Sequence, residues 1–272
     1  MDISSLGAYA GNLNFKGATD VAMKGAKKLI QDLPALKLKN PMEVPFGEFS
    51  KVLEENEALT KAYRAQLDAV CFDENGNLAP EIAKFLDETT FEITTGGSKG
   101  VPIQTTIKDY LRQSIHTPEV AQGTLFHGTL NPRNIDNIIE NGFDVSKINS
   151  GRTKLGPGFY FSGDYGAAMN YGCVLQADAK GIVAGADNAF YENVANSKTC
   201  KQVGDLIGLT PEVCDDPETC YNYPAKLINE YSRKFIVEKL GIDALRGWGG
   251  NSTADNCVCV LNPNILTNIR RA

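Results

Sequence analysis

The hydrophobic pattern of this chain changes near residue 120, and that change limits the fold to one that mixes helices and strands. In the first part of the chain apolar residues recur at helical spacing, most clearly over residues 46–70, where Val52 and Tyr63 would share one face. From about residue 122 onward, short β-rich runs alternate with single helices and glycine-containing loops. We therefore predict an α+β protein, with a mostly helical N-terminal region at residues 1–118 and a second domain at residues 119–272.

Helical periodicity divides the N-terminal region into separate segments. The sequence predicts helices over residues 17–33, 46–70, 80–89 and 101–115, with a flexible break at residues 94–100. No residue in this region points to a particular chemistry. We expect it to serve as a helical cap or as a partner-binding region.

The overall composition excludes several classes of protein. The chain has 272 residues, of which 42% are hydrophobic and 22% are charged, as is ordinary for a globular protein. Its net charge of −6 argues against a general binder of nucleic acids or anionic membranes. It has no run of about eighteen apolar residues and does not begin with a basic stretch followed by an apolar one, so we expect neither a transmembrane helix nor a Sec signal peptide. We expect a protein that stays in the cytoplasm of the producing cell, or that a non-Sec secretion system delivers into a host cytosol.

The cysteine pattern favours neither a disulfide scaffold nor a metal site. The seven cysteines are Cys71, Cys173, Cys200, Cys214, Cys220, Cys257 and Cys259. An odd number in a long chain is not typical of a disulfide-stapled scaffold. None of the spacings is C-x-x-C, and only His116 and His127 could complete a zinc site. We therefore expect reduced thiols and no bound metal.

The second half has a readable order of elements. A β-rich run ends at His127-Gly128-Thr129, and a helix follows with Asn131 as N-cap, Pro132 at its first position and Gly142 as a left-handed C-cap. After it we expect a loop at residues 144–158, a strand at 159–162, a helix within 163–172 and closing strands near 244 and 256–266. Residues 173–224 fit no pattern, so they would form either a surface insertion or an element that recognises an acceptor.

Four short motifs of this half carry a family resemblance. LFHGT, IIENGFD, GPGFYFS and AAMNY occur in that order within residues 125–171. At these spacings they resemble the catalytic core of the poly(ADP-ribose) polymerase-like ADP-ribosyltransferases, the diphtheria-toxin-type branch with a His and a Tyr in the site. The resemblance covers about residues 122–272 and implies a split β-sandwich that uses NAD as co-substrate.

The resemblance also implies roles for single residues. His127 would bond the adenosine ribose, and the Gly128 backbone would bind the nicotinamide carboxamide, since a side chain would block close approach. Tyr160 and Tyr171 would stack on the two faces of nicotinamide. Thr129 would contact the nicotinamide-side ribose or simply pack. Each residue also has a purely structural interpretation, with the histidine at a strand end and the tyrosines in a core.

The diphosphate of NAD requires cations or backbone donors. Arg133, Arg152 and Lys154 are the candidate cations of this region, although such side chains are more often only solvated. The resemblance also places Gly158 among the cofactor-binding residues, where it could instead shape the loop.

Two positions depart from the family pattern. Ala168 stands where the family often has a serine that holds the carboxamide, and Asn256 or Cys257 stands where many members have a catalytic glutamate. The nearest acids that could replace that glutamate are Asp255, Glu230 and Glu238. Loss of the glutamate makes chain elongation unexpected, so the sequence predicts transfer of a single unit.

The predicted function is therefore mono-ADP-ribosyl transfer, a glycosyltransferase reaction in which NAD is cleaved and one ADP-ribose is attached to a protein. A bacterial effector or virulence toxin that modifies a host signalling protein or ubiquitin would fit, whereas a nucleic-acid acceptor would fit the acidic charge poorly. Three alternatives remain open at this stage. They are an NAD glycohydrolase toxin, a non-catalytic NAD or ADP-ribose binding module, and an α+β interaction protein whose motif spacing is accidental.

Overall fold

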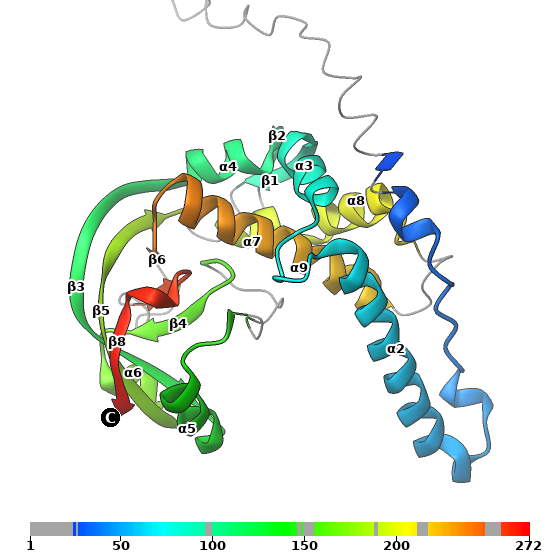
Figure 1. The fold of residues 1–272 in the computed structure, drawn as a ribbon, viewed down its shortest axis with the longest axis horizontal. Helices are drawn as coiled ribbons and strands as arrows, with labels where there is room; N and C mark the ends of the chain where they lie inside the picture. The colour runs from blue at the N-terminus through cyan, green and yellow to red at the C-terminus, as the bar shows by residue number, and fades with distance from the viewer. Residues whose placement is uncertain are drawn as a thin grey trace, which may run out of the picture.

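A computed structural model describes residues 24–25, 27–95, 100–145, 148, 155–187, 190–210, 217–247 and 257–272. Most helices gather on one side of the molecule, and a strongly curved sheet with α5 and α6 beside it forms the other side, as Figure 1 shows. The predicted mixture of helices and strands is therefore confirmed.

The elements follow one another in an irregular order. The N-terminal part contains α2 (Phe49–Cys71), α3 (Pro80–Glu88), β1 (Thr90–Thr95), β2 (Val101–Thr106) and α4 (Ile107–Ser114), preceded by 3-10 turns at Pro41–Glu43 and Phe46–Glu48. It is followed by β3 (Ile115–Thr129), α5 (Pro132–Asn141), β4 (Phe159–Ser162), α6 (Tyr165–Met169), β5 (Cys173–Ala186), α7 (Phe190–Val194) and α8 (Ser197–Ile207). The C-terminal part has α9 (Pro217–Lys234), a π-helical turn (Phe235–Lys239), β6 (Ala244–Arg246), β7 (Cys257–Val260), a 3-10 turn (Pro263–Ile265) and β8 (Leu266–Arg271).

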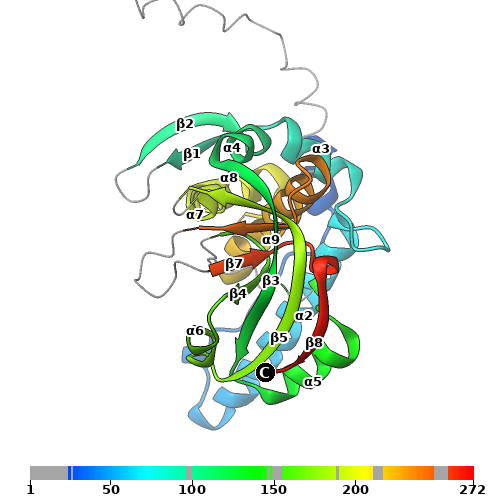
Figure 2. The ribbon, with the colours of Figure 1, turned by 90° about the vertical axis from the view of Figure 1, so that its left-hand side faces the viewer.

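Five strands close into a barrel. Their order is β3-β4-β7-β6-β5, and β5 pairs back onto β3, while β8 is added beside β5. All of these pairs are antiparallel except β5–β6. The two long strands β3 and β5 curve around the barrel side by side in both views (Figure 2). Closure leaves fewer free strand edges and gives the short strands β4, β6 and β7 a partner on each side.

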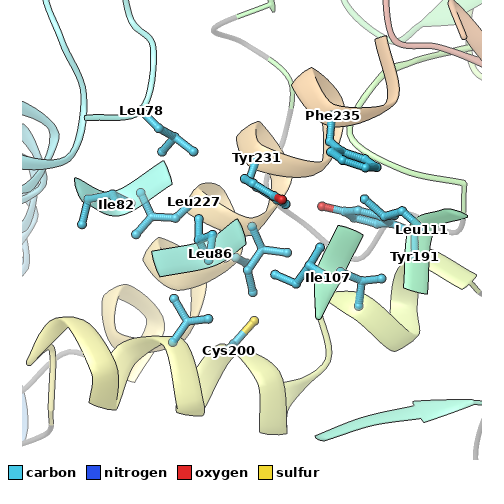
Figure 3. Packing of buried hydrophobic residues seen from close by; sticks show 14 of the residues in the cluster. Leu78, Ile82, Leu86, Ile107, Leu111, Tyr191, Cys200, Leu227, Tyr231 and Phe235 are labelled. Atoms are coloured by element: carbon cyan, nitrogen blue, oxygen red, sulfur yellow. The ribbon is translucent and has the colours of Figure 1, made fainter. Parts of the chain in front are cut away.

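Two clusters of buried side chains stabilise these layers. The larger one joins α2, α3, β1 and α4 to α7, α8, α9 and parts of the strands β5, β6 and β7. Figure 3 shows some of its side chains, among them Leu86, Leu111, Cys200, Leu227 and Tyr231. The smaller one gathers side chains from β4 to β8 around Ile135 of α5. The larger cluster has members on both sides of residue 118, and β3 itself crosses that position. The division into domains at 118/119 stays a prediction.

The helix after β3 confirms the predicted N-cap and the predicted end at Gly142, but not the left-handed helical conformation of that glycine. The Asn131 side chain accepts a hydrogen bond from the Arg133 backbone N–H at 3.0 Å, and Pro132 occupies the first turn. Gly142 ends the helix with a φ of 78°, although its ψ of −175° lies outside the left-handed helical region. The local capping signals therefore set both ends of α5.

Two predicted segments were wrong. Residues 101–115 do not form one helix, because residues 101–106 pair with β1 as a hairpin and helix α4 begins only at Ile107. The described residues within 173–224 are not a surface insertion, whereas their alternative role as an element that recognises an acceptor stays a prediction. Cys173–Ala186 is β5, which pairs with three other strands, and α8 buries Cys200, Val203 and Ile207.

Two further findings on the described part of the chain concern membrane-spanning helices and metal-binding groups. None of its helices combines enough length and apolar character to cross a lipid bilayer. Within the same residues there is no group of three or more His, Cys, Asp or Glu side chains that could hold a metal ion. The six cysteines described are free thiols, and Cys214 lies outside the described residues.

Candidate functional site

The strands β3 and β4 form a fork. They pair at Phe126 and Ser162 and, in these two fully described strands, at no residue beyond that pair. A regular antiparallel ladder would continue to Gly128 opposite Tyr160. The strands therefore separate where the sequence places the His-Gly-Thr motif and the tyrosine of FYFS, and we call this separation the fork.

His127 bridges the fork with its side chain. Its Nδ1 lies 2.8 Å from the backbone carbonyl oxygen of Tyr160. Because a carbonyl only accepts hydrogen bonds, Nδ1 carries the proton and Nε2 keeps its lone pair. The imidazole thus replaces a backbone partner that the diverging strand no longer supplies.

The surroundings of His127 keep its ring neutral. The ring contacts Phe161 with centroids 5.4 Å apart and Phe143 with centroids 5.8 Å apart. Burial lowers the pKa of His127 below its ordinary value of 6.5, and the bond to the Tyr160 carbonyl only partly opposes this. At neutral pH the ring is therefore an uncharged hydrogen-bond acceptor at Nε2.

Gly128 and Tyr160 share the opposite face of the fork. Phe126 and Ser162 lie directly opposite each other, so the residues two positions further along the two strands point to the same side. Helix α6 covers this side at Gly128. A Cβ atom on Gly128 would lie 2.1 Å from the Ala168 carbonyl oxygen and 2.8 Å from the Tyr171 Cβ. Only glycine allows this approach of α6 to β3.

The Tyr160 hydroxyl holds the segment that precedes its own strand. It accepts a hydrogen bond from the Leu155 backbone N–H at 3.0 Å and donates one to the Gly156 carbonyl at 3.1 Å. Gly158 in the same segment packs tightly against β7, since a Cβ there would lie 2.5 Å from the Val260 carbonyl oxygen. The predicted loop-shaping interpretation of Gly158 thus has a direct steric basis.

The remaining predicted residues lie at the rim. Tyr171 is 68% exposed, beside Gly128. The Thr129 hydroxyl accepts from the Asn134 side-chain amide at 3.3 Å, at the start of α5. Arg133 is exposed in the first turn of that helix. The structure therefore brings Gly128, Tyr160, Ala168 and Tyr171 to one face of the fork and the His127 ring to the other face.

The candidate acids are not part of the fork as described. Glu230 lies on α9 and forms an ion pair with Arg233 at 2.7 Å, and Glu238 is exposed in the π-helical turn. Asp255 and Arg152, like Lys154, lie outside the described residues. The strands β4 and β7 contain no carboxylate, and Cys257 stands opposite Ser162.

Sequence reasoning missed the aromatic support of His127. Phe143 contacts His127, Phe159 and Phe161, and Tyr165 of α6 packs edge-on against Phe126. The only signal for Phe143 was its place directly after the helix-ending glycine. Which rings meet depends on how α5 folds back onto the strands.

Comparison with known proteins adds no family assignment, because no protein-family model and no curated protein matches this chain. Any role of the fork residues therefore rests on their geometry and on the motif resemblance.

Proposed function

We propose that this protein is a mono-ADP-ribosyltransferase that cleaves NAD and transfers one ADP-ribose to a protein acceptor. The observation that carries the proposal is the fork, where His127 is fixed on the Tyr160 carbonyl and Gly128 is held against α6. The four motifs of the resemblance meet at this one place. In this proposal, the barrel with its separated strands corresponds to the split β-sandwich of the resembled family.

The fork offers distinct groups to the two ends of NAD. On the face of Gly128 and α6, Tyr160 and the exposed Tyr171 would flank the nicotinamide ring, and the Gly128 backbone would bind its carboxamide. On the other face, the neutral His127 would accept a hydrogen bond from an adenosine ribose hydroxyl at Nε2. Thr129 and Arg133 at the rim would contact the ribose and the diphosphate. Arg152, which lies outside the described residues, is a further candidate cation for the diphosphate in this proposal.

The reaction breaks the bond between nicotinamide and ribose. The bonding electron pair leaves with neutral nicotinamide, and positive charge develops on the ribose as an oxocarbenium-like state. A nucleophilic side chain of the acceptor then bonds to the ribose carbon and loses its proton. Holding both ends of NAD supplies orientation, which is a major part of such catalysis.

The lack of a carboxylate on β4 and β7 favours transfer of a single unit. A carboxylate near the ribose would stabilise the developing charge, and Asp255 is the acid closest in sequence to β7. The same lack favours two further candidates, an NAD glycohydrolase and a non-catalytic binding module. For the acceptor, the acidic charge of the chain favours a protein over a nucleic acid, and a host signalling protein or ubiquitin would fit delivery as an effector.

Nicotinamide release from NAD tests the proposal. We expect release by the purified protein only when host-cell lysate is present, together with the mass of one ADP-ribose added to a lysate protein. His127→Ala should lower the rate by about 100-fold or more if the ring orients the substrate in the transition state. The matched control is His116→Ala, which removes the other histidine, an exposed residue at the opposite end of β3.

Each other outcome leads to a different conclusion. Release in buffer alone would identify a glycohydrolase. A rise of the melting temperature with NAD but without release would identify a binding module. No release and no shift would overturn the proposal, and full activity of His127→Ala would overturn the site.

A further inference from the structure

A cavity lies outside the fork. It has a volume of about 770 Å³ and lies between the C-terminal end of α2, the turn at residues 73–77 and helix α9. Val145, Ile148 and Pro157 close it from the side of the barrel. Pro157 directly precedes Gly158 and stands three residues before Tyr160, so the cavity borders the segment that leads into the fork. Cavities of this size hold ligands as large as a drug molecule or a short peptide segment.

The charges that line the cavity favour a cation. Four carboxylates and two cations contribute to the wall, namely Asp68, Asp73, Glu74, Glu230, Lys226 and Arg233. Lys226 is paired with Asp68 at 2.7 Å, and Arg233 is paired with Glu230 at 2.7 Å. Both cations are thus paired with a neighbour, and Asp73 and Glu74 leave the wall with a net negative charge. The Asp73 carboxylate already accepts hydrogen bonds from Asn75 and Asn77, so Glu74 is the main candidate to meet a ligand.

Asn229 adds an unsatisfied acceptor to this wall. The residue is only 6% exposed, it lines the cavity from α9, and its Oδ1 has no hydrogen-bond partner. A buried amide oxygen without a donor destabilises the fold, because it has lost its hydrogen bonds to water and gained none in return. A ligand that brings N–H donors into the cavity would remove this penalty once the amide rotates towards it.

The cavity already holds one cation of the chain itself. The Lys226 Nζ lies 4.8 Å from the centroid of the Phe72 ring and 2.7 Å from Asp68. A carboxylate beside an aromatic face is a combination that suits ammonium and guanidinium groups. Ala69, Val145, Ile148 and Pro157 supply an apolar surface for an aliphatic side-chain stem.

We propose that this cavity binds a basic side chain, arginine or lysine, of the acceptor protein and so anchors that protein beside the fork. The proposal rests on the proposed function for the identity of the partner, whereas the preference for a cation rests on the cavity alone. The cation would lie between Glu74 and Asn229, and its stem would lie against the apolar wall. The site would select acceptors that carry a basic residue near the modified position.

Titration calorimetry on the full chain tests the preference for a cation. The probes are a short, otherwise uncharged peptide with one central arginine and the same peptide with citrulline, which has nearly the same shape without the charge. We expect the arginine peptide to bind about tenfold or more tightly, as hydrogen bonds that involve a charge are the stronger ones. Equal binding of both peptides, or saturation by neither, would overturn the proposal. Displacement of the arginine peptide by adenosine would assign the cavity to a nucleoside and overturn it as well.

Two variants connect the binding to the cavity wall. Glu74→Gln should weaken binding of the arginine peptide about two- to fivefold, as expected for an exposed charge pair. Its matched control is Glu81→Gln, the same change on an exposed residue of α3 outside the cavity, which should bind like the unaltered chain. Asn229→Leu should abolish binding while the unfolding midpoint in urea stays unchanged or rises, because the unsatisfied oxygen is removed. Unchanged binding in Glu74→Gln or Asn229→Leu would contradict the assignment.

The two proposals can fail separately. If nicotinamide is released in the presence of lysate but the arginine peptide does not bind, only the anchor pocket is wrong. If the peptide binds but no NAD is cleaved, the preference for a cation holds and its connection to an acceptor is lost.

Discussion

The larger cluster contains fully buried phenylalanine rings, whereas two tyrosines on and just after α6, beside the fork, are largely exposed. Phe85 and Phe91 are at most 1% exposed inside the larger cluster, but Tyr171 and Tyr165 beside the fork are 68% and 46% exposed. Exposed rings gain no burial energy in the free protein, although large apolar side chains stabilise a fold chiefly through burial. The difference indicates that the larger cluster maintains the structure. In the proposed function, the exposed rings beside the fork would be available to NAD.

Glycine use differs between the fork and the open part of the same strand. A Cβ on Gly128 would collide with the backbone of α6, whereas one on Gly123 of the same strand would meet nothing within 4 Å. At the fork, the backbone of α6 therefore lies directly against β3 with no side chain between them. The helical body is held together by side-chain packing instead.

The largest effect is expected in the helical body. Phe85→Ala should lower the free energy of unfolding by about 3–5 kcal/mol, because it removes a fully buried ring and leaves a cavity. Urea denaturation would measure the change. The control is Phe46→Ala, since Phe46 is 95% exposed and its removal should have almost no effect. Similar losses in both variants would mean that the larger cluster does not dominate the stability.

A smaller loss is expected from tight packing at the fork. Gly128→Ala should destabilise the protein by about 1–3 kcal/mol, because α6 must shift away from β3. Gly123→Ala is the control and should stay close to the unaltered chain in the same denaturation experiment. If both variants unfold alike, α6 is not held against Gly128.

A pH-dependent effect should come from His127. Its pKa in the folded state is lowered by burial, so the stability that the neutral ring contributes is complete above pH 6.5 and is lost as the pH falls through the folded pKa. An NMR titration of the His116→Ala variant, whose only remaining histidine is His127, should give a midpoint below 6.5. A midpoint at or above 6.5 would contradict the buried, carbonyl-bound ring.

The smallest effect on stability is expected at the rim. Tyr171→Ala should change the free energy of unfolding by no more than about 0.5 kcal/mol, because the side chain is mostly exposed. The same variant should lose the rise in melting temperature that we expect NAD to produce. Leu130→Ala, at an exposed neighbouring position, should keep that rise. A destabilisation by Tyr171→Ala as large as that of Gly128→Ala would mean that the ring is structural.

Local sequence signals predicted the elements whose cause is local. Asn131, Pro132 and Gly142 set the ends of α5, and the period of apolar residues identified α2 and α3. The hairpin of β1 and β2 was missed because Ile103 and Thr105 fit a helical period as easily as a strand. Only their pairing with β1 decides between these structures.

For the candidate site, the sequence likewise indicated the residues but not their contacts. The motif spacing pointed to His127, Gly128, Tyr160 and Tyr171, which the structure places around one fork. The motif spacing could not indicate that the His127 ring donates a hydrogen bond to a backbone carbonyl. The motif resemblance also led to Glu230 as a possible catalytic acid, and its pairing with Arg233 on α9 lay beyond what that resemblance could reveal.

The sequence by itself determined the two ends of α5, the approximate spans of α2 and α3, the mixture of helices and strands, and which motif residues would gather. Only the tertiary structure decided that β5 belongs to the barrel, that β3 and β4 separate at His127, and that Asp68 meets Lys226 across 158 positions. The physical reason is that capping and periodicity act within a few residues. Strand pairing, burial and the neutralisation of charges instead depend on which distant segments the closed barrel and the shared core bring together.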